Sequence, residues 1–339
     1  MRALLSRTPG GPESLELADL AVPQPRAGQV LVRVAATALN YPDALMIEDR
    51  YQVKPPRPFV PGAEMSGLVE AVGEDVSGFV AGDRVFGIGF GGLAEYALLD
   101  QRKCFHLPDD LPFEPAAGLT VTYGTALHAL SDHGALQAGE TLLVLGAAGG
   151  VGIAAVELGR ARGARVVAAV SSPEKAAIAR AAGADETLIY PRGELSEPQM
   201  RSLGESLKHV IGAQGADVIF DPLGGAYADA ALRSLAWEGR YLIIGFTAGI
   251  PALKANLLLL RGARACGVYW GNWTERNPER FRAQIDELLQ LWQRGGIKPK
   301  VSRVLPLRDA HEGFRALASR EATGKIVIRP GEATDVPAP

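Results

Sequence analysis

A short apolar run near the middle of the chain passes into a glycine-rich turn and then into a helix-like segment. Residues 142–145 have strand character, residues 146–152 form the turn, and helix-like sequence continues over residues 153–162. A second apolar strand at residues 165–170 completes a βαβ unit. In such a unit the glycines let the backbone approach a pyrophosphate, and the N–H groups and positive dipole end of the helix face it. The sequence therefore predicts a dinucleotide site formed by Ala148, Gly149, Gly150, Val151 and Gly152.

The residues that follow the second strand bear on which dinucleotide binds. A site that prefers NAD usually carries Asp or Glu about 20 residues beyond the glycines, where it holds the ribose 2′-hydroxyl. This chain has Ser171 and Ser172 there, followed by Glu174 and Lys175. The small hydroxyls leave room for a 2′-phosphate and Lys175 supplies positive charge, so we expect NADP rather than NAD, with Glu174 pointing away. In the alternative interpretation the serines only cap the next helix and Lys175 is a solvated surface charge.

Size and composition exclude several classes of protein. The chain has 339 residues, enough for two domains, and a net charge of −3 that gives no support for a nucleic-acid partner. No apolar run approaches the roughly 20 residues needed to cross a bilayer, so a cytoplasmic location and no membrane partner are expected. The two cysteines, Cys104 and Cys266, stand in no metal-ligand spacing, and the five histidines are scattered.

The chain changes character along its length. Its first ~120 residues alternate apolar and polar positions between Gly and Pro turns, which indicates a β-rich region. Strands and helices then alternate, which indicates a doubly wound parallel sheet with its ligand at the carboxyl ends of the strands. We expect helices at 116–130, 228–236 and 278–294, strands at 217–221, 239–245, 265–269 and 324–328, and a disordered tail at 330–339.

Five segments stand in this order along the chain: residues 38–43 (ALNYPD), 61–67 (PGAEMSG), 82–85 (GDRV), 147–152 (AAGGVG) and 324–328 (GKIVI). Together they resemble the medium-chain dehydrogenase/reductase superfamily, and most of all its zinc-independent NADPH:quinone oxidoreductase branch, the zeta-crystallin-like proteins. The resemblance implies an α/β fold in which a Rossmann doubly wound parallel-sheet domain is inserted in a GroES-like β-rich catalytic domain. The catalytic domain would comprise residues 1–123 and 272–339, and the NADP-binding domain residues 124–271.

The chain departs from the zinc alcohol dehydrogenases of the same superfamily at the positions that hold their metal. Those enzymes carry a cysteine where this chain has Asn40 and a histidine where it has Ala63, and their four-cysteine lobe has no counterpart between Gly89 and Asp110. Without zinc there is no Lewis acid to lower the pKa of an alcohol. We therefore expect no metal site and no alcohol oxidation.

The resemblance also implies cofactor-binding residues beyond the glycine turn. In the quinone reductase branch, residues like Ser171, Lys175 and Tyr190 surround the adenosine 2′-phosphate. Thr125 and Lys325 are expected to hold the cofactor. The nicotinamide half should lie at the ends of Rossmann strands, which here carry Gly245, Phe246, Val268 and Trp270.

Two polar residues are the candidate catalytic groups by the same resemblance. Asn40 could donate its amide to a quinone oxygen or to the nicotinamide ribose, and Tyr51 could donate a hydrogen bond, or a proton, to the oxygen that becomes negative. In an alternative interpretation Tyr51 is a loop aromatic that packs on Pro55. Asp43 is expected to cap the helix that follows it, and Glu64 to be a structural hydrogen-bond acceptor rather than a catalytic group.

These residues favour an NADPH-dependent quinone reductase that acts on a small molecule. An alternative is reduction of an activated C=C bond in an enone or enoyl thioester, for which Arg50, Lys54 and Arg57 could form a basic entrance. A second alternative is a protein that binds NADPH or RNA without turnover. By resemblance we also expect a homodimer formed through a Rossmann edge strand between Ala265 and Tyr269, since an unpaired apolar edge invites aggregation.

Overall fold

The computed structural model describes residues 1–331, and these form two compact units. The first unit consists of Met1–Val121 together with the chain from Pro299 onward, and the second is Thr122–Lys298. We predicted the second segment to end at residue 271, whereas in the structure α10 (Pro278–Gln293) groups with the second unit. Phe281 of this helix packs edge-on against Trp270. From residue 332 on, the tail predicted to be disordered lies outside the described residues.

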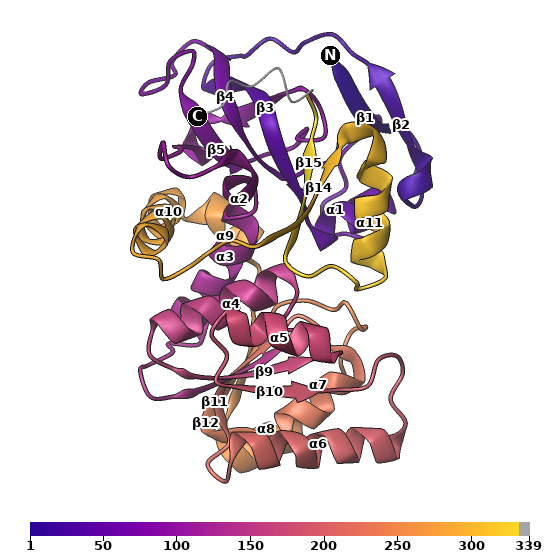
Figure 1. The fold of residues 1–339 in the computed structure, drawn as a ribbon, viewed down its shortest axis with the longest axis vertical. Helices are drawn as coiled ribbons and strands as arrows, with labels where there is room; N and C mark the ends of the chain where they lie inside the picture. Colours follow the sequence, from indigo (N-terminus) through magenta and orange to yellow (C-terminus); the bar gives the residue numbers. More distant parts are fainter. Residues whose placement is uncertain (332–339) are drawn as a thin grey trace. The chain divides into compact units, whose positions relative to one another are not determined.

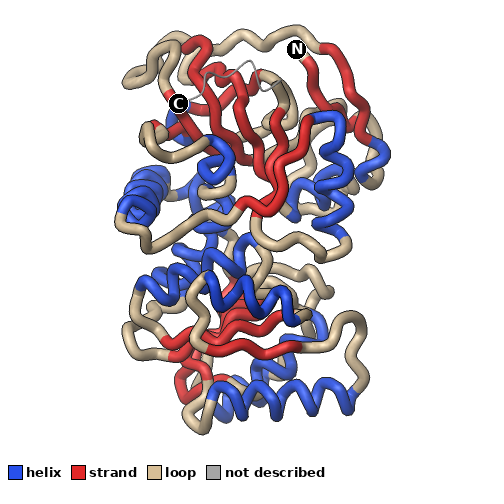
Figure 2. The backbone as a smooth tube through the Cα atoms, viewed as in Figure 1, coloured by secondary structure: helices blue, strands red, loops and turns tan. Residues whose placement is uncertain are grey.

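The second unit is built on a six-stranded parallel sheet in the order β10-β9-β8-β11-β12-β13. Figure 1 shows α4 and α5 on one side of this sheet and α6, α7 and α8 on the other, and Figure 2 shows the strands as a single layer. This is the predicted doubly wound Rossmann arrangement, and it places the carboxyl ends of the strands at one edge. The strands are β8 (Thr141–Leu145), β9 (Arg165–Val170), β10 (Glu186–Ile189), β11 (Ala216–Asp221), β12 (Leu235–Ile243) and β13 (Arg264–Gly267), and the helices α3 (Thr120–His128), α4 (Gly150–Ala161), α5 (Pro173–Ala181), α6 (Glu197–Ile211), α7 (Gly225–Leu232), α8 (Ala255–Arg261) and α9 (Trp270–Arg276).

Two elements of this unit differ from their predicted bounds. The helix predicted at 228–236 is α7, which begins and ends earlier, and β12 begins at Leu235 rather than at residue 239. The apolar residues Leu235 and Ala236 belong to the strand because they are buried beside β11, where Ala216 pairs with Leu235. Glu238 has φ 56°, so the strand is irregular at the point where the sequence suggests a helix end.

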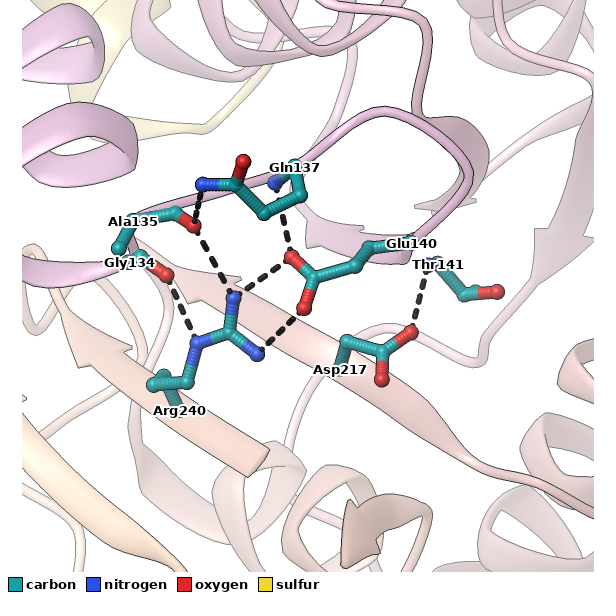
Figure 3. Close-up of polar contacts among 7 residues, drawn as sticks. All are labelled: Gly134, Ala135, Gln137, Glu140, Thr141, Asp217 and Arg240. Atoms are coloured by element: carbon teal, nitrogen blue, oxygen red, sulfur yellow. Dashed lines mark hydrogen bonds and ion pairs between the residues drawn. The ribbon is translucent and has the colours of Figure 1, made fainter. Parts of the chain in front are cut away.

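A network of hydrogen bonds and an ion pair lies at the amino ends of the strands, beside the start of β8 (Figure 3). The Arg240 side chain donates from Nη1 and Nη2 to the two oxygens of Glu140, at 2.9 and 2.6 Å, and from Nε to the Gly134 carbonyl at 2.7 Å. Burial alone would raise the pKa of Glu140, but the hydrogen bonds from Arg240 and from the Gln137 backbone more than offset it, so this pKa is lowered. The network holds the amino ends of the strands together, and it does not involve their carboxyl ends.

The first unit contains a seven-stranded sheet in the order β14-β15-β3-β4-β5-β7, with β6 also paired to β3, and a separate two-stranded sheet, β1-β2. Here β15 runs antiparallel to β3, with Ile326 opposite Leu39. This pairing brings the start of β15 beside Asn40, although the two segments are far apart in the sequence. The strands are β1 (Arg2–Ser6), β2 (Leu15–Asp19), β3 (Gln29–Leu39), β4 (Glu64–Val72), β5 (Arg84–Ile88), β6 (Tyr96–Asp100), β7 (Cys104–His106), β14 (Val301–Pro306) and β15 (Lys325–Arg329), and the helices α1 (Tyr41–Ile47), α2 (Phe113–Ala117) and α11 (Ala310–Ala318).

The single helix predicted at 116–130 is divided in the structure. It forms α2 and α3 with a break that includes Gly118, followed by a π-helical turn at Ala129–His133. A β-carbon at Gly118 would lie 2.8 Å from Cγ of Lys325, so glycine is needed for the buried Lys325 side chain to pass. None of the helices in residues 1–331 is both long and apolar enough to cross a membrane.

Candidate cofactor and active site

The glycine turn between β8 and α4 has the geometry of an anion cradle. Gly149 precedes α4 as its N-cap, and no side chain caps the helix there. The first-turn N–H groups of an uncapped helix are available to a ligand, and the helix dipole favours a negative one. A β-carbon at Gly149 would approach nothing nearer than the Gly146 carbonyl oxygen, at 3.4 Å. The space above this turn is therefore open to a phosphate group.

Gly152 has a different role in the same turn. A β-carbon at Gly152 would lie 2.3 Å from the Gly146 carbonyl oxygen and 2.8 Å from Cα of Ala147. Both atoms belong to the backbone and cannot move aside easily, so only glycine allows α4 to pack this closely on the turn. Ala148 is buried beneath the turn, and Gly150 and Val151 begin the helix.

Ser171, Ser172, Lys175 and Tyr190 lie where β9 and β10 end. Ser172 is the N-cap of α5, and its hydroxyl accepts the Lys175 backbone N–H at 3.3 Å. Ser171 accepts a hydrogen bond from Nε of Arg192 at 3.2 Å. Tyr190 is buried, with its ring 5.0 Å from that of Tyr227. Arg192 is the residue that sequence reasoning missed, and its position two residues beyond Tyr190 was the available signal.

Glu174 was expected to point away from the 2′-phosphate, but its side chain is hydrogen-bonded to Ser172. Its hydrogen bond with the Ser172 side chain, helped by the nearby positive charge of Arg192, lowers the pKa of the Glu174 carboxyl. One carboxylate therefore lies beside Ser172, while Arg192 reaches Ser171 from the following loop. The same few residues thus offer cations for a phosphate and an acceptor for a hydroxyl.

The residues predicted for the nicotinamide half lie at or after the ends of β12 and β13. Gly245 and Phe246 follow β12, and the Phe246 side chain is 43% exposed. Val268 follows β13, and its N–H donates to the Ile243 carbonyl at 2.9 Å. Trp270 is a packing residue, since its indole is buried and its N–H donates to Gln284 at 2.8 Å.

Thr125 lies in α3, next to the position where this helix meets Trp270. A β-carbon at Gly124 would be 2.5 Å from Cζ2 of Trp270, so the two segments pack at a glycine. The Thr125 side chain is half-buried. The structure thus brings Thr125 and Trp270 into one part of the second unit.

A buried polar cluster occupies the first unit, where β3, β4 and β15 meet. The Lys325 ammonium donates to Oδ1 of Asn40 at 2.6 Å and to Oε1 of Glu64 at 2.5 Å. The Asn40 amide nitrogen donates to the same Glu64 oxygen at 2.9 Å, and the Val121 N–H donates to the other at 2.8 Å. The side chains of Lys325 and Glu64 are 4% and 0% exposed, so this is an ion pair removed from water.

Asp43 is the fourth member of this cluster. It was expected to cap the helix that follows it, but it lies inside α1 at the third position, and the N-cap is Asn40. Oδ2 of Asp43 accepts the Asn40 backbone N–H at 2.8 Å, which forms a capping box. Its Oδ1 is buried and has no hydrogen-bond partner in the structure. Burial raises the pKa of Asp43 from 3.8 to about 7, although the Asn40 N–H and the Lys325 ammonium both act to lower it.

The cluster shows how the predicted catalytic residues of this unit are placed. Both ends of the Asn40 amide are engaged, by Lys325 and by Glu64, so the amide is held in one orientation. Tyr51 is partly exposed and lies in the loop after α1. Arg57, one of the residues suggested for a basic entrance, connects β1 to the end of α1, because it donates hydrogen bonds to Ser6, to two α1 carbonyls and to Asp49.

Metal-binding groups are not gathered in the described chain. Among residues 1–331, no three His, Cys, Asp or Glu side chains lie close enough together to hold a metal ion. Of the two residues that the family resemblance places at zinc-ligand positions of the alcohol dehydrogenases, Asn40 accepts a hydrogen bond from an ammonium group through its amide oxygen, and Ala63 has no ligating atom in its side chain.

Comparisons with known proteins agree with this geometry. Two family models match the chain: "Alcohol dehydrogenase GroES-like domain" at residues 26–109 and "Zinc-binding dehydrogenase" at residues 150–290. The bovine quinone oxidoreductase-like protein 2 is 38% identical over 303 residues, which cover 88% of this chain and 84% of that protein. The quinone oxidoreductase of Sus scrofa is 33% identical over 94% of both chains.

A solved structure has the same fold over almost the whole chain. A mycobacterial protein solved in complex with NADPH superimposes with a TM-score of 0.90 and 30% identity, covering 97% of this chain and 100% of that one. The sheet order, the glycine turn and these relatives lead to one assignment. The chain belongs to the medium-chain dehydrogenase/reductase superfamily of oxidoreductases, in its quinone oxidoreductase-like branch.

Proposed function

We propose that this protein is an NADPH-dependent quinone reductase. The observation that carries the proposal is the group of donors at the end of β9, where Arg192 donates to the Ser171 hydroxyl and Lys175 lies in the first turn of α5. Two cations and a hydroxyl suit a dianionic 2′-phosphate, which NADH lacks. That a relative of the same fold was solved with NADPH supports this choice.

The glycine turn fits the pyrophosphate of such a cofactor. The first turn of α4 is uncapped and a β-carbon at Gly149 would fill otherwise open space, so the backbone there can approach the phosphates. When bound, the cofactor supplies a hydride to an electrophilic carbon of the acceptor. The protein's part is to bind both molecules, orient them and supply a hydrogen bond where negative charge develops.

Tyr51 is the proposed donor to the oxygen of the acceptor. A quinone reduced by hydride leaves a delocalised phenolate, and one hydroxyl or water is sufficient to hydrogen-bond or protonate it. Asn40 is the proposed orienting group for the acceptor oxygen or for the cofactor ribose. Its amide is held in place by the Lys325 ammonium and the Glu64 carboxylate.

We propose that the reaction uses no zinc. The Asn40 side chain, at the position of a zinc-ligating cysteine in the alcohol dehydrogenases, is already bonded to the buried Lys325 ammonium. A second cation at this place would face strong repulsion in a buried, low-dielectric environment. The carboxylate of Glu64 is neutralised by the same ammonium.

The proposal is tested by following NADPH absorbance with purified protein. Benzoquinone, phenanthrenequinone and a short enone would be compared in parallel, with NADH as the alternative donor. Rapid loss of NADPH with a quinone and little loss of NADH would support the proposal. Turnover with the enone alone would move the function to alkene reduction, and tight NADPH binding without turnover would favour a binding protein.

The role of the 2′-phosphate group has its own matched comparison. Arg192→Ala should raise the KM for NADPH at least tenfold, since a charge-assisted hydrogen bond contributes about 1.5–3 kcal/mol, and should leave the KM for NADH unchanged. Arg180→Ala is the control, because Arg180 is also exposed but donates to Thr187. An equal effect of Arg192→Ala on both cofactors would contradict the assignment.

We further propose that the protein forms a homodimer through β13. This strand lies at the edge of the six-stranded sheet, and nearby Leu259, Leu260 and Trp237 are 79%, 66% and 68% exposed. A second copy that pairs with the edge would cover both its unpaired backbone groups and these apolar side chains. A monomer by light scattering at micromolar concentration would refute this proposal, and Leu260→Glu should shift a dimer toward monomer.

A further inference from the structure

The carboxylate of Asp221 joins two segments at the carboxyl edge of the sheet, and the proposed reaction gives it no role. Asp221 is the last residue of β11 and is 1% exposed. Its Oδ1 accepts the backbone N–H groups of Leu223 and Gly224, at 2.7 and 2.9 Å. Its Oδ2 accepts the hydroxyl of Tyr241, which is fully buried on the neighbouring strand β12.

The proton of this pair belongs to the tyrosine. Burial, together with the negative charge of Asp221, raises the pKa of Tyr241, so the hydroxyl keeps its proton and donates it in the hydrogen bond. Burial also raises the pKa of Asp221, although the hydrogen bonds from Tyr241 and the two N–H groups act to lower it. The carboxyl group thus accepts hydrogen bonds from three donors, which hold it in one orientation.

The segment that Asp221 holds is bonded in turn to the segment after β12. The Ala248 N–H donates to the Leu223 carbonyl at 2.7 Å, and the Gly225 N–H donates to the Gly249 carbonyl at 2.7 Å. A β-carbon at Gly224, which has φ 68°, would lie 2.5 Å from the Gly249 carbonyl oxygen. The loops 222–225 and 244–249 are therefore in direct backbone contact, and neither can shift without the other.

The loop 222–225 also reaches the glycine turn. Cδ2 of Leu223 lies 3.1 Å from the place that a β-carbon of Gly146 would take. Loop 222–225 thus contacts both the glycine turn, which suits a pyrophosphate, and the loop that carries Gly245 and Phe246. Phe246 is exposed between the anchored residues on either side of it.

We propose that Asp221 and Tyr241 are positioning residues, which hold loop 244–249 in the conformation that receives the nicotinamide half of the cofactor. The inference rests on the proposed function only in taking a nicotinamide dinucleotide as the ligand. Neither side chain is exposed enough to touch the cofactor, so both act through the backbone of the two loops.

The test compares two ligands in the variant Tyr241→Phe. NADPH and 2′-phospho-ADP-ribose, which lacks the nicotinamide, would each be titrated by calorimetry. Loss of a buried hydrogen bond to a charged group should weaken NADPH binding about tenfold. Binding of 2′-phospho-ADP-ribose should change less than about twofold, because loop 222–225 meets the glycine turn only through the Leu223 side chain, whereas it is joined to loop 244–249 by backbone hydrogen bonds.

Arg240→Gln is the matched control, since Arg240 is the neighbouring residue on the same strand but bonds to Glu140 at the opposite edge of the sheet. It should destabilise the second unit and leave the affinity for both ligands unchanged. Asp221→Asn is a smaller change to the same set of hydrogen bonds, because an amide oxygen can still accept the two loop N–H groups. Its affinity for NADPH should fall between those of wild type and Tyr241→Phe.

Unchanged NADPH affinity in Tyr241→Phe, or an equal loss for the two ligands, would overturn the inference. Failure of the proposed function is seen separately, as NADPH binding by the wild type without turnover of any acceptor. If the wild type binds NADH instead, the same comparison is made with NADH and ADP-ribose, and its outcome decides the inference in the same way.

Discussion

Asp43 is buried with one carboxylate oxygen that has no partner, and this predicts an unusual dependence of stability on pH. In the unfolded chain this carboxyl ionises near pH 3.8, whereas in the folded protein its pKa is about 7. Between these two values the folded state binds one proton more than the unfolded state, so stability falls as pH rises. The slope is about 1.4 kcal/mol per pH unit, and the whole interval therefore costs about 4 kcal/mol. The stabilising effect of the neutral form is complete below pH 3.8 and lost above about pH 7.

The substitution Asp43→Asn removes the ionisation and keeps an oxygen that can accept the Asn40 N–H. The new amide hydrogens lie where Oδ1 has no partner, which adds a constant cost of about 1–3 kcal/mol. Relative to wild type, the variant should therefore gain stability steadily from pH 5 to pH 7 and no further above that. The gain over these two pH units should be about 3 kcal/mol.

Urea unfolding at half-unit steps of pH from 5 to 8, followed by far-ultraviolet circular dichroism, measures this difference. Tryptophan fluorescence is a useful second signal, because all four tryptophans lie in the second unit and report on the unit without Asp43. Asp83→Asn is the matched control, since Asp83 accepts the N–H of the residue three before it in the same way but is only partly buried. Parallel pH profiles for wild type and Asp43→Asn would refute the reasoning.

The remaining predictions concern the glycine turn and the two ion pairs. Gly152→Ala should destabilise the second unit by more than about 2 kcal/mol because its β-carbon meets backbone atoms, whereas Gly149→Ala should unfold like wild type but bind NADPH at least tenfold more weakly. Thermal unfolding measures the first effect and calorimetry the second, and equal melting temperatures of the two variants would contradict the packing argument. Lys325→Met should cost about 3–5 kcal/mol in urea unfolding because it leaves a buried carboxylate unpaired, and a loss below 1 kcal/mol would show that the cluster is solvated in solution. Arg240→Gln should lower the free energy of unfolding by about 2 kcal/mol at pH 7 and by less as pH falls below 4.5, because the pKa of its partner Glu140 is lowered and the pair is stabilising only where that carboxyl is ionised. A loss of stability in urea titrations that does not depend on pH would argue against the ion pair.

The sequence was sufficient to predict the second unit's architecture because its signal is local. A strand, a glycine turn and a helix follow one another within 20 residues, and the same alternation repeats to the end of the sheet. Boundaries were less certain where local preference and tertiary pairing disagree. Leu235 and Ala236 follow an alanine-rich helix and read as its last turn, yet pairing with β11 makes them strand.

The buried cluster of the first unit could be predicted only in part. The segment around Asn40 and the final strand were both recognised, but nothing in the sequence joins Lys325 to Glu64 across 261 positions. Their contact arises because β15 pairs with β3 and Gly118 leaves room for the lysine side chain. Arg192 was missed for a related reason, since its partner Ser171 lies 21 positions away on another loop.

The bond between Lys325 and Asn40 has a consequence for how a chain that carries this pair could change its chemistry. A metal ion is exchanged with its surroundings, whereas an ammonium group on the chain is retained whatever the supply of metals or chelators. Replacing Asn40 by a cysteine would therefore place the sulfur against the Lys325 side chain instead of creating half of a metal site. A lineage that carries this lysine would have to lose it before it could acquire zinc, and the intermediate would carry an unpaired buried carboxylate at Glu64. On the function proposed above, the lysine keeps the place of a metal ion occupied by a cation of the chain itself.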